Sequence, residues 1–150
     1  MSQQQLQQLS QELQEIEEQI DALEANVEEI QQEQTEVDEA IDALDTLESD
    51  STVQVPLGGG AYLRATIDDI DEAIVELGSD YAAEFEQDDA VEVLERKKET
   101  LDDQIDDLND EIGDLESESD DLESQAQQLQ QQAMQQQMQQ LGGQGQEPDE

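Results

Sequence analysis

Residues 52–85 read TVQVPLGGGAYLRATIDDIDEAIVELGSDYAAEF, and this stretch decides the fold because it is the part of the chain without a heptad pattern. Apolar and polar residues alternate on both sides of the glycine run at 58–60, which is typical of half-buried β-strands. The same alternation recurs on both sides of Gly78-Ser79-Asp80, a second turn signal. The sequence therefore predicts two consecutive β-hairpins over residues 52–86.

This hub, residues 52–86, is too small to be stable as two separate hairpins in water. Its strands carry more apolar side chains than one chain can cover, and their open edges are able to pair with other strands. We therefore predict that the chain is not a stable monomer and that the hub binds other subunits. The residues predicted to make these assembly contacts are Val53, Val55, Leu57, Leu63, Ile67, Val75, Leu77 and Tyr81.

Apolar residues at alternating steps of three and four precede and follow the hub, which is the spacing of a coiled coil. We call these two rows the apolar seam. The pattern predicts a helical arm over residues 1–51 and a second over residues 87–140. The first row is Leu6, Leu9, Leu13, Ile16, Ile20, Leu23, Val27, Ile30, Val37, Ile41 and Leu44, and the second is Val91, Leu94, Leu101, Ile105, Leu108, Ile112, Leu115, Ser119, Leu122, Ala126, Leu129 and Ala133.

The two rows match each other if the arms run antiparallel and partner numbers sum to about 135. Leu6 then lies beside Leu129, and every a position faces a d position. Two polar residues, Gln34 and Lys98, interrupt the rows within one heptad of each other. The sequence therefore predicts a helical hairpin whose register is fixed by a polar layer.

The chain has 44 acidic and four basic residues, a formal net charge of −40. Nucleic acid and anionic lipid are bound mainly through Lys and Arg, so neither is an expected partner. Replacement of lysine by Asp and Glu resembles proteins of salt-loving archaea. Carboxylates also flank the seam on both arms, so we expect folding to need salt; they include Glu17, Glu24, Asp38, Asp102, Glu111, Glu116 and Glu118.

Several kinds of chemistry lack the residues that they need. The chain has no Cys and no His, and its acidic pairs recur as solvated helix faces, so no metal, cofactor or nucleophile site is expected. The glycine run lacks the Lys-Ser/Thr of a phosphate loop. Because no nucleophile with its base is recognisable, we expect no enzyme activity. No apolar run approaches the ~20 residues of a membrane span and no signal peptide is recognisable, so we expect a cytoplasmic protein.

Charge disappears in two segments that the antiparallel arrangement brings together. Residues 1–14 contain seven glutamines and one acid, and residues 125–146 contain thirteen glutamines and no charge. We call these two segments the glutamine-rich tip. Toward this end of the second row, Ser119, Ala126 and Ala133 occupy seam positions in place of large apolar residues, which predicts loose packing. Gly142, Gly143, Gly145 and Pro148 predict a disordered tail over residues 141–150.

The hub also carries a resemblance to a known family. Val55-Pro56-Leu57-Gly58, Tyr62 and Ala65, then Val75-Glu76-Leu77-Gly78, Tyr81 and Glu84, all between two coiled-coil arms, resemble the alpha subunits of the archaeal prefoldin family. The resemblance implies a hexamer of two alpha and four beta subunits, with the hairpins in an intersubunit β-barrel platform. It also implies capture of unfolded proteins at the arm tips without nucleotide, and their transfer to a group II chaperonin. Phe85, where a basic residue is expected, and the glutamine-rich tip depart from the family pattern.

Three classes of function remain to be compared. The first is a chaperone subunit, whose client-binding residues are predicted to be Leu6, Leu9, Leu129, Met134 and Met138. For the three leucines, a purely structural role in the seam is the alternative. The second class is a coiled-coil spacer that only dimerises, and it leaves the loss of acidity at the tip unexplained. The third is an enzyme that uses the acids of the hub, for which no nucleophile and base are recognisable.

Overall fold

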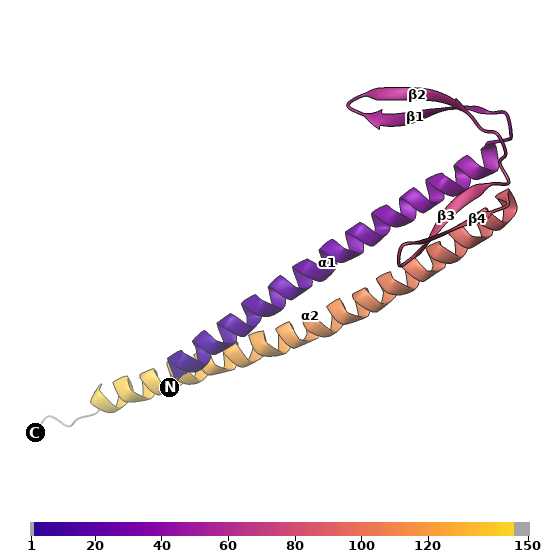
Figure 1. Cartoon of the computed structure of the whole chain (residues 1–150). Helices are drawn as coiled ribbons and strands as arrows, with labels where there is room; N and C mark the ends of the chain where they lie inside the picture. Colours follow the sequence, from indigo (N-terminus) through magenta and orange to yellow (C-terminus); the bar gives the residue numbers. More distant parts are fainter. Residues whose placement is uncertain (1, 146–150) are drawn as a thin grey trace, which may run out of the picture. The chain divides into compact units, whose positions relative to one another are not determined.

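The computed structural model describes residues 2–145 as two long helices separated by two β-hairpins (Figure 1). Helix α1 is Ser2–Thr46 and helix α2 is Gln87–Gly145. Strands β1 (Thr52–Gly58) and β2 (Ala61–Thr66) form the first hairpin, and β3 (Ala73–Gly78) and β4 (Tyr81–Phe85) form the second. The prediction of a mostly α-helical chain with a small β hub is therefore confirmed.

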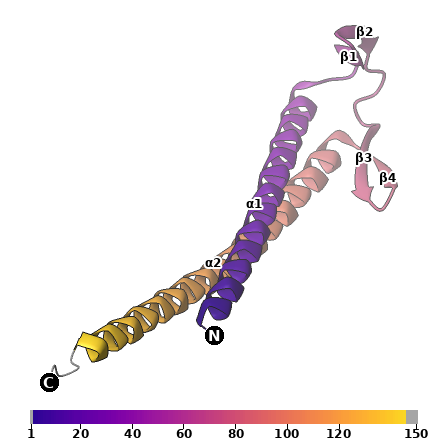
Figure 2. The ribbon, with the colours of Figure 1, turned by 90° about the vertical axis from the view of Figure 1, so that its left-hand side faces the viewer.

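Both hairpins have the same turn design. Two residues connect the strands in each, Gly59-Gly60 in the first and Ser79-Asp80 in the second, and all four have positive φ angles. A two-residue turn in which both residues have positive φ angles matches the right-handed twist of the two strands that it connects. Each register also shifts by one residue just before the turn, at Leu57 and at Leu77. The strands of each hairpin lie side by side in both views (Figures 1 and 2).

The chain divides into two compact units. The first contains residues 1–27 and 107–150, and the second contains residues 28–106. Along both helices every residue of the predicted seam is buried or half-buried, while most of the residues between them are exposed. Because this pattern has the period expected of a coiled coil, it confirms the assignment of the seam within each unit.

The second unit has a core in which the second hairpin packs on both helices. Its buried members are Val37 from α1, Val75 from β3, and Ala90, Leu94 and Leu101 from α2. Around them lie the half-buried side chains of Ile30, Ala40, Ile41, Leu44, Ala73, Phe85 and Val93. Phe85 therefore contacts the chain's own core, which accounts for an apolar side chain at the position where the resemblance implies a basic one.

The predicted polar layer lies in this unit. The Gln34 side-chain amide donates hydrogen bonds to the carbonyl oxygen of Lys98, at 3.4 Å, and to Oδ1 of Asp102. The Nζ atom of Lys98 lies 2.7 Å from Oδ1 of Asp38. These partners have numbers that sum to between 132 and 136, as the antiparallel register predicts. Asp38 was expected to add to the repulsion between arms, and this was wrong because Lys98 neutralises it.

The ion pair changes the acidity of Lys98. The hydrogen bond and the negative charge of Asp38 raise the pKa of the Lys98 ammonium above its ordinary 10.5, and the charges of Asp102 and Glu95 add to this effect while desolvation opposes it. A cation whose pKa is raised on folding stabilises the fold below its ordinary pKa, and this contribution is lost as the pH rises through the higher, folded value. The pair is therefore intact at neutral pH.

The first helix ends earlier than the heptads suggest. The sequence places its end near Asp50-Ser51, and the structure places it at Thr46. Residues 48–51 instead form a turn in which Asp50 has a positive φ and the Ser51 hydroxyl accepts a hydrogen bond from the Glu48 amide. The Gln87 side chain at the start of α2 donates to the carbonyl oxygens of Leu44 and Leu47. The first of these bonds satisfies a carbonyl oxygen in the last turn of α1, and the second binds the residue just after the helix.

The second helix extends further than predicted. The tail was expected to begin at residue 141, but α2 continues to Gly145. Glutamine is a good helix former, so the long glutamine run favours continuation of the helix into the following residues. The rest of the predicted tail, residues 146–150, lies outside the described part of the chain.

Candidate functional site

The two hairpins present an apolar surface that the chain itself leaves exposed. Val55 lies opposite Leu63 in the first hairpin, so both side chains occupy one face. Leu57 and Leu77 precede the two turns, and Tyr81 follows the second. All five are exposed, as predicted for the assembly surface, whereas Val53 and Ile67 are half-buried. Tyr62 on β2, which was not predicted, is also exposed.

Strand β3 corrects one member of the predicted assembly surface. Val75 is only 7% exposed and belongs to the core of the second unit, so it is covered within the chain. Its neighbour Ile74 is 74% exposed and was missed. Adjacent residues of a strand point to opposite faces, so burial of Val75 turns Ile74 outward. Alternation alone does not decide which of two neighbouring apolar residues faces the helices.

Substitution by aspartate should have different effects at Val75 and at Ile74. Val75→Asp places a carboxyl group without a partner in the core, so we expect it to lower the free energy of unfolding by about 3 kcal/mol or more. Ile74→Asp changes an exposed side chain and should alter chain stability by about 0.5 kcal/mol or less, while weakening association. Urea denaturation followed by circular dichroism in molar salt measures stability, and light scattering measures association. Equal losses of stability in the two variants would contradict the assignment of β3's faces.

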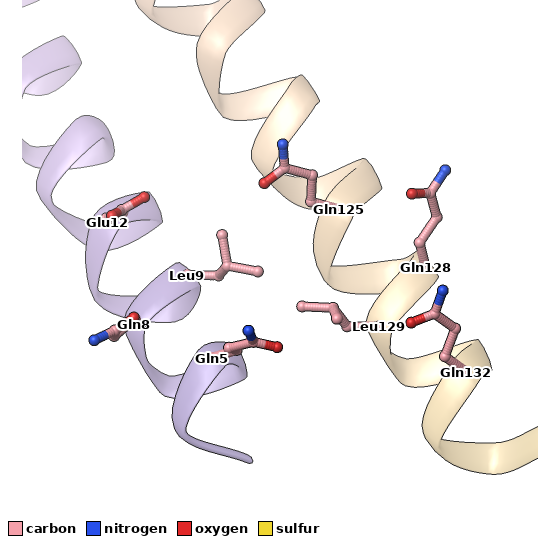
Figure 3. Close-up of a pocket in the computed structure, with 8 residues that line it drawn as sticks. All are labelled: Gln5, Gln8, Leu9, Glu12, Gln125, Gln128, Leu129 and Gln132. Carbon is pink, nitrogen blue, oxygen red and sulfur yellow. The ribbon is translucent and has the colours of Figure 1, made fainter. Parts of the chain in front are cut away.

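The glutamine-rich tip contains a hollow of about 350 Å³ in the first unit (Figure 3). Leu9 and Leu129 point toward each other from the two helices, with Gln5 and Gln125 beside them. The full lining is Gln5, Gln8, Leu9, Glu12, Gln125, Gln128, Leu129 and Gln132. Leu9 and Leu129, both members of the predicted seam, therefore line this hollow together.

The predicted client-binding residues fall into two groups. Leu6, Leu9 and Leu129 are half-buried members of the seam. Met134 and Met138 are 68% and 74% exposed, and Leu141, which was not predicted, is 69% exposed. The spacing of Leu141 from Met138, three residues on, could have revealed it, but residue 141 was assigned to the tail. Glu12 supplies the one charge among the residues that line the hollow.

Two other kinds of site are not found among the described residues. No helix within residues 2–145 is both long and apolar enough to cross a membrane. The same residues contain no group of three or more carboxylates arranged to hold a metal ion. The exposed side chains at the hairpins and the glutamines and leucines at the tip can bind apolar or neutral polar groups.

Comparison with known proteins identifies similar chains. A family model described as "Prefoldin subunit" matches residues 16–132. The "Prefoldin subunit alpha" of Haloarcula marismortui is 71% identical over 59 residues, which cover 39% of this chain and 38% of that relative. The "Prefoldin subunit alpha" of Halorubrum lacusprofundi is 63% identical over 59 residues, 39% of each chain. The matched stretch thus spans well under half the length of these curated relatives.

A solved structure shares the fold. A filamentous PFD from Methanocaldococcus jannaschii, determined by cryo-EM, matches with a TM-score of 0.52 and 23% sequence identity. The match covers 79% of this chain and 95% of that one. The two similar alpha subunits come from salt-loving archaea, in agreement with the acidic composition of this chain.

Proposed function

Because the chain belongs to the prefoldin subunit family, we propose that it is an alpha-type subunit of an ATP-independent chaperone that holds unfolded proteins and transfers them to a group II chaperonin. The observation that carries the proposal is the loss of charge at the tip. In a chain of net charge −40, residues 124–146 contain no charged side chain and expose Met134 and Met138.

This tip suits an unfolded client. Desolvating a carboxylate beside an apolar segment is costly, whereas neutral glutamines and flexible methionines adapt to many apolar segments. The hollow between Leu9 and Leu129 offers further apolar contact to such a segment. One tip binds weakly, but several tips that hold one client together bind with the avidity of linked sites. A holding chaperone needs this combination of breadth and reversible binding.

The hairpins support the proposed assembly. Val55, Leu57 and Leu63 expose an apolar face on the first hairpin, and Ile74, Leu77 and Tyr81 expose another group on the second. Exposed groups of this kind mark contacts with other proteins. We assign them to beta subunits, in a heterohexamer of two alpha and four beta chains whose strands complete a β-barrel platform. The same exposed apolar surface also fits the spacer alternative, in which the hub only dimerises.

One experiment separates the two alternatives. The chain, mixed with beta subunits in molar salt without ATP, should delay the aggregation of a chemically unfolded protein in proportion to its concentration, as followed by light scattering. The control contains beta subunits without this chain and measures how far they alone delay the aggregation. Aggregation as fast as with beta subunits alone, despite assembly shown by size-exclusion chromatography, would leave the coiled-coil spacer as the function.

A further inference from the structure

Three exposed apolar side chains form a stripe on helix α2. Met134, Met138 and Leu141 are spaced by four and three residues, so they lie on one face of the helix. They are 68%, 74% and 69% exposed. The seam residue Ala133 is half-buried, and at about 100° per residue the three side chains lie roughly 80–140° around the helix from it, to one side of the seam. We call Met134, Met138 and Leu141 the methionine stripe.

The charge around this stripe decides which macromolecule can cover it. The acids nearest in sequence are Glu123 and Glu147, with 23 uncharged residues in between at 124–146. Elsewhere two copies of the chain would bring carboxylates against carboxylates, since acidic residues outnumber basic ones by 44 to four. Like charges oppose such an approach. The methionine stripe is the apolar helix face on which two copies can meet without this repulsion.

The stripe is also complementary to itself. If two α2 helices lie antiparallel, Met138 faces Met138 of the second copy, and Met134 lies level with Leu141 of that copy to within one residue. Each side chain then meets an apolar partner: Met138 pairs with its own copy once, on the axis, and the contact between Met134 and Leu141 occurs twice. This is the arrangement that a two-fold interface requires.

We propose that two copies of this chain associate through the methionine stripe, with their α2 helices antiparallel about a two-fold axis beside Met138. Three side chains from each copy form a small interface, so the association is weak and depends on concentration. It does not depend on client capture. However, it covers Met134 and Met138, so a second copy and an unfolded client compete for the same residues.

Single cysteines test this geometry directly, because the chain has no cysteine of its own. The full-length Met138→Cys variant, oxidised in molar salt, should form disulfide-linked dimers with a yield several-fold above that of Gln136→Cys. Gln136 is exposed in the same uncharged segment but lies about 200° around the helix from Met138, so it reports random collision. Non-reducing electrophoresis measures the yield, and circular dichroism checks that the variants keep their helix content.

The flanking positions distinguish antiparallel from parallel helices. A mixture of Met134→Cys and Leu141→Cys should cross-link well, while each variant alone should remain at the Gln136→Cys level. Efficient cross-linking of Met134→Cys with itself means parallel helices and overturns the proposal. A Met138→Cys yield equal to that of Gln136→Cys also overturns it.

If an unfolded client rather than a second copy binds the methionine stripe, the cross-linking result will differ. Met138→Cys oxidised together with reduced, unfolded lysozyme would then link to lysozyme and form no dimers in its absence, which overturns pairing between copies. The delay of aggregation is measured separately with the unmodified chain. Failure of the proposed chaperone function and failure of this pairing are therefore read from different experiments.

Discussion

Transfer from molar salt to about 0.1 M salt is expected to unfold much of the two helices, because the Debye length grows from roughly 3 Å to about 10 Å. Two carboxylates 10 Å apart in water repel by about 0.4 kcal/mol without screening. A few tens of such pairs match the total stability of a domain, about 5–15 kcal/mol. Within residues 2–145 only two ion pairs oppose this repulsion, Arg96–Glu92 and Lys98–Asp38, and only the second joins the helices. Circular dichroism during dilution of the salt measures the loss of helix.

Neutral variants distinguish charge repulsion from the general effect of salt on apolar burial. Replacing five carboxylates that flank the seam with glutamine preserves side-chain size and removes the charge: Glu17, Glu24, Glu111, Glu116 and Glu118. This variant should need less salt for half-maximal helicity than the unmodified chain. The same midpoint in both chains would show that repulsion between the arms does not set the salt requirement.

Removal of residues 1–12 and 126–150 is expected to abolish the delay of client aggregation while leaving assembly with beta subunits intact. The two cuts remove matching stretches of the antiparallel helices, so the remaining seam keeps its partners. None of the removed residues belongs to the core around Val37 and Val75. Size-exclusion chromatography measures assembly, and light scattering of an unfolded client measures protection.

A milder change should give an intermediate result. Met134→Glu with Met138→Glu restores acidity on the exposed face of the tip, so we expect a several-fold loss of protection with little change in assembly. Gln104→Glu with Asn109→Glu adds the same charge at exposed positions outside the tip and is the matched control. If the truncated chain protects clients as well as the full chain does, the capture surface lies elsewhere, on the hub or on the beta subunits.

The sequence predicted most of the fold because two simple periodicities dominate it. The heptad rows predicted both helices and a register close to the observed one, and the turn signals at residues 58–60 and 78–80 predicted both hairpins. What failed depended on contacts that periodicity does not encode. The faces of β3 were set by packing of Val75 on the two helices, and the end of α1 was set by capping from Gln87, 43 residues away in sequence from Leu44.

The candidate site was predicted less completely for the same reason. Met134 and Met138 could be placed at the tip from composition alone. Leu9 and Leu129 were both identified as seam residues from the heptad spacing, and both line the hollow. Ile74 needed knowledge of which side chains the rest of the chain covers, and Leu141 was missed because residue 141 was assigned to the tail.

The nesting of cross-helix contacts has a consequence for how the chain reaches its fold. Gln87 and Leu44 are 43 residues apart, Gln34 and Lys98 are 64 apart, and Leu9 and Leu129 are about 120 apart. Each contact lies inside the loop that the next one closes. Closing the longest loop first costs more chain entropy than closing the shortest, by about 0.6 kcal/mol for each doubling. Once Gln87 caps α1, each further layer adds only a few residues to a closed loop. The helical hairpin can therefore zip in order from its connected end, so that a non-local topology forms by a succession of nearly local steps.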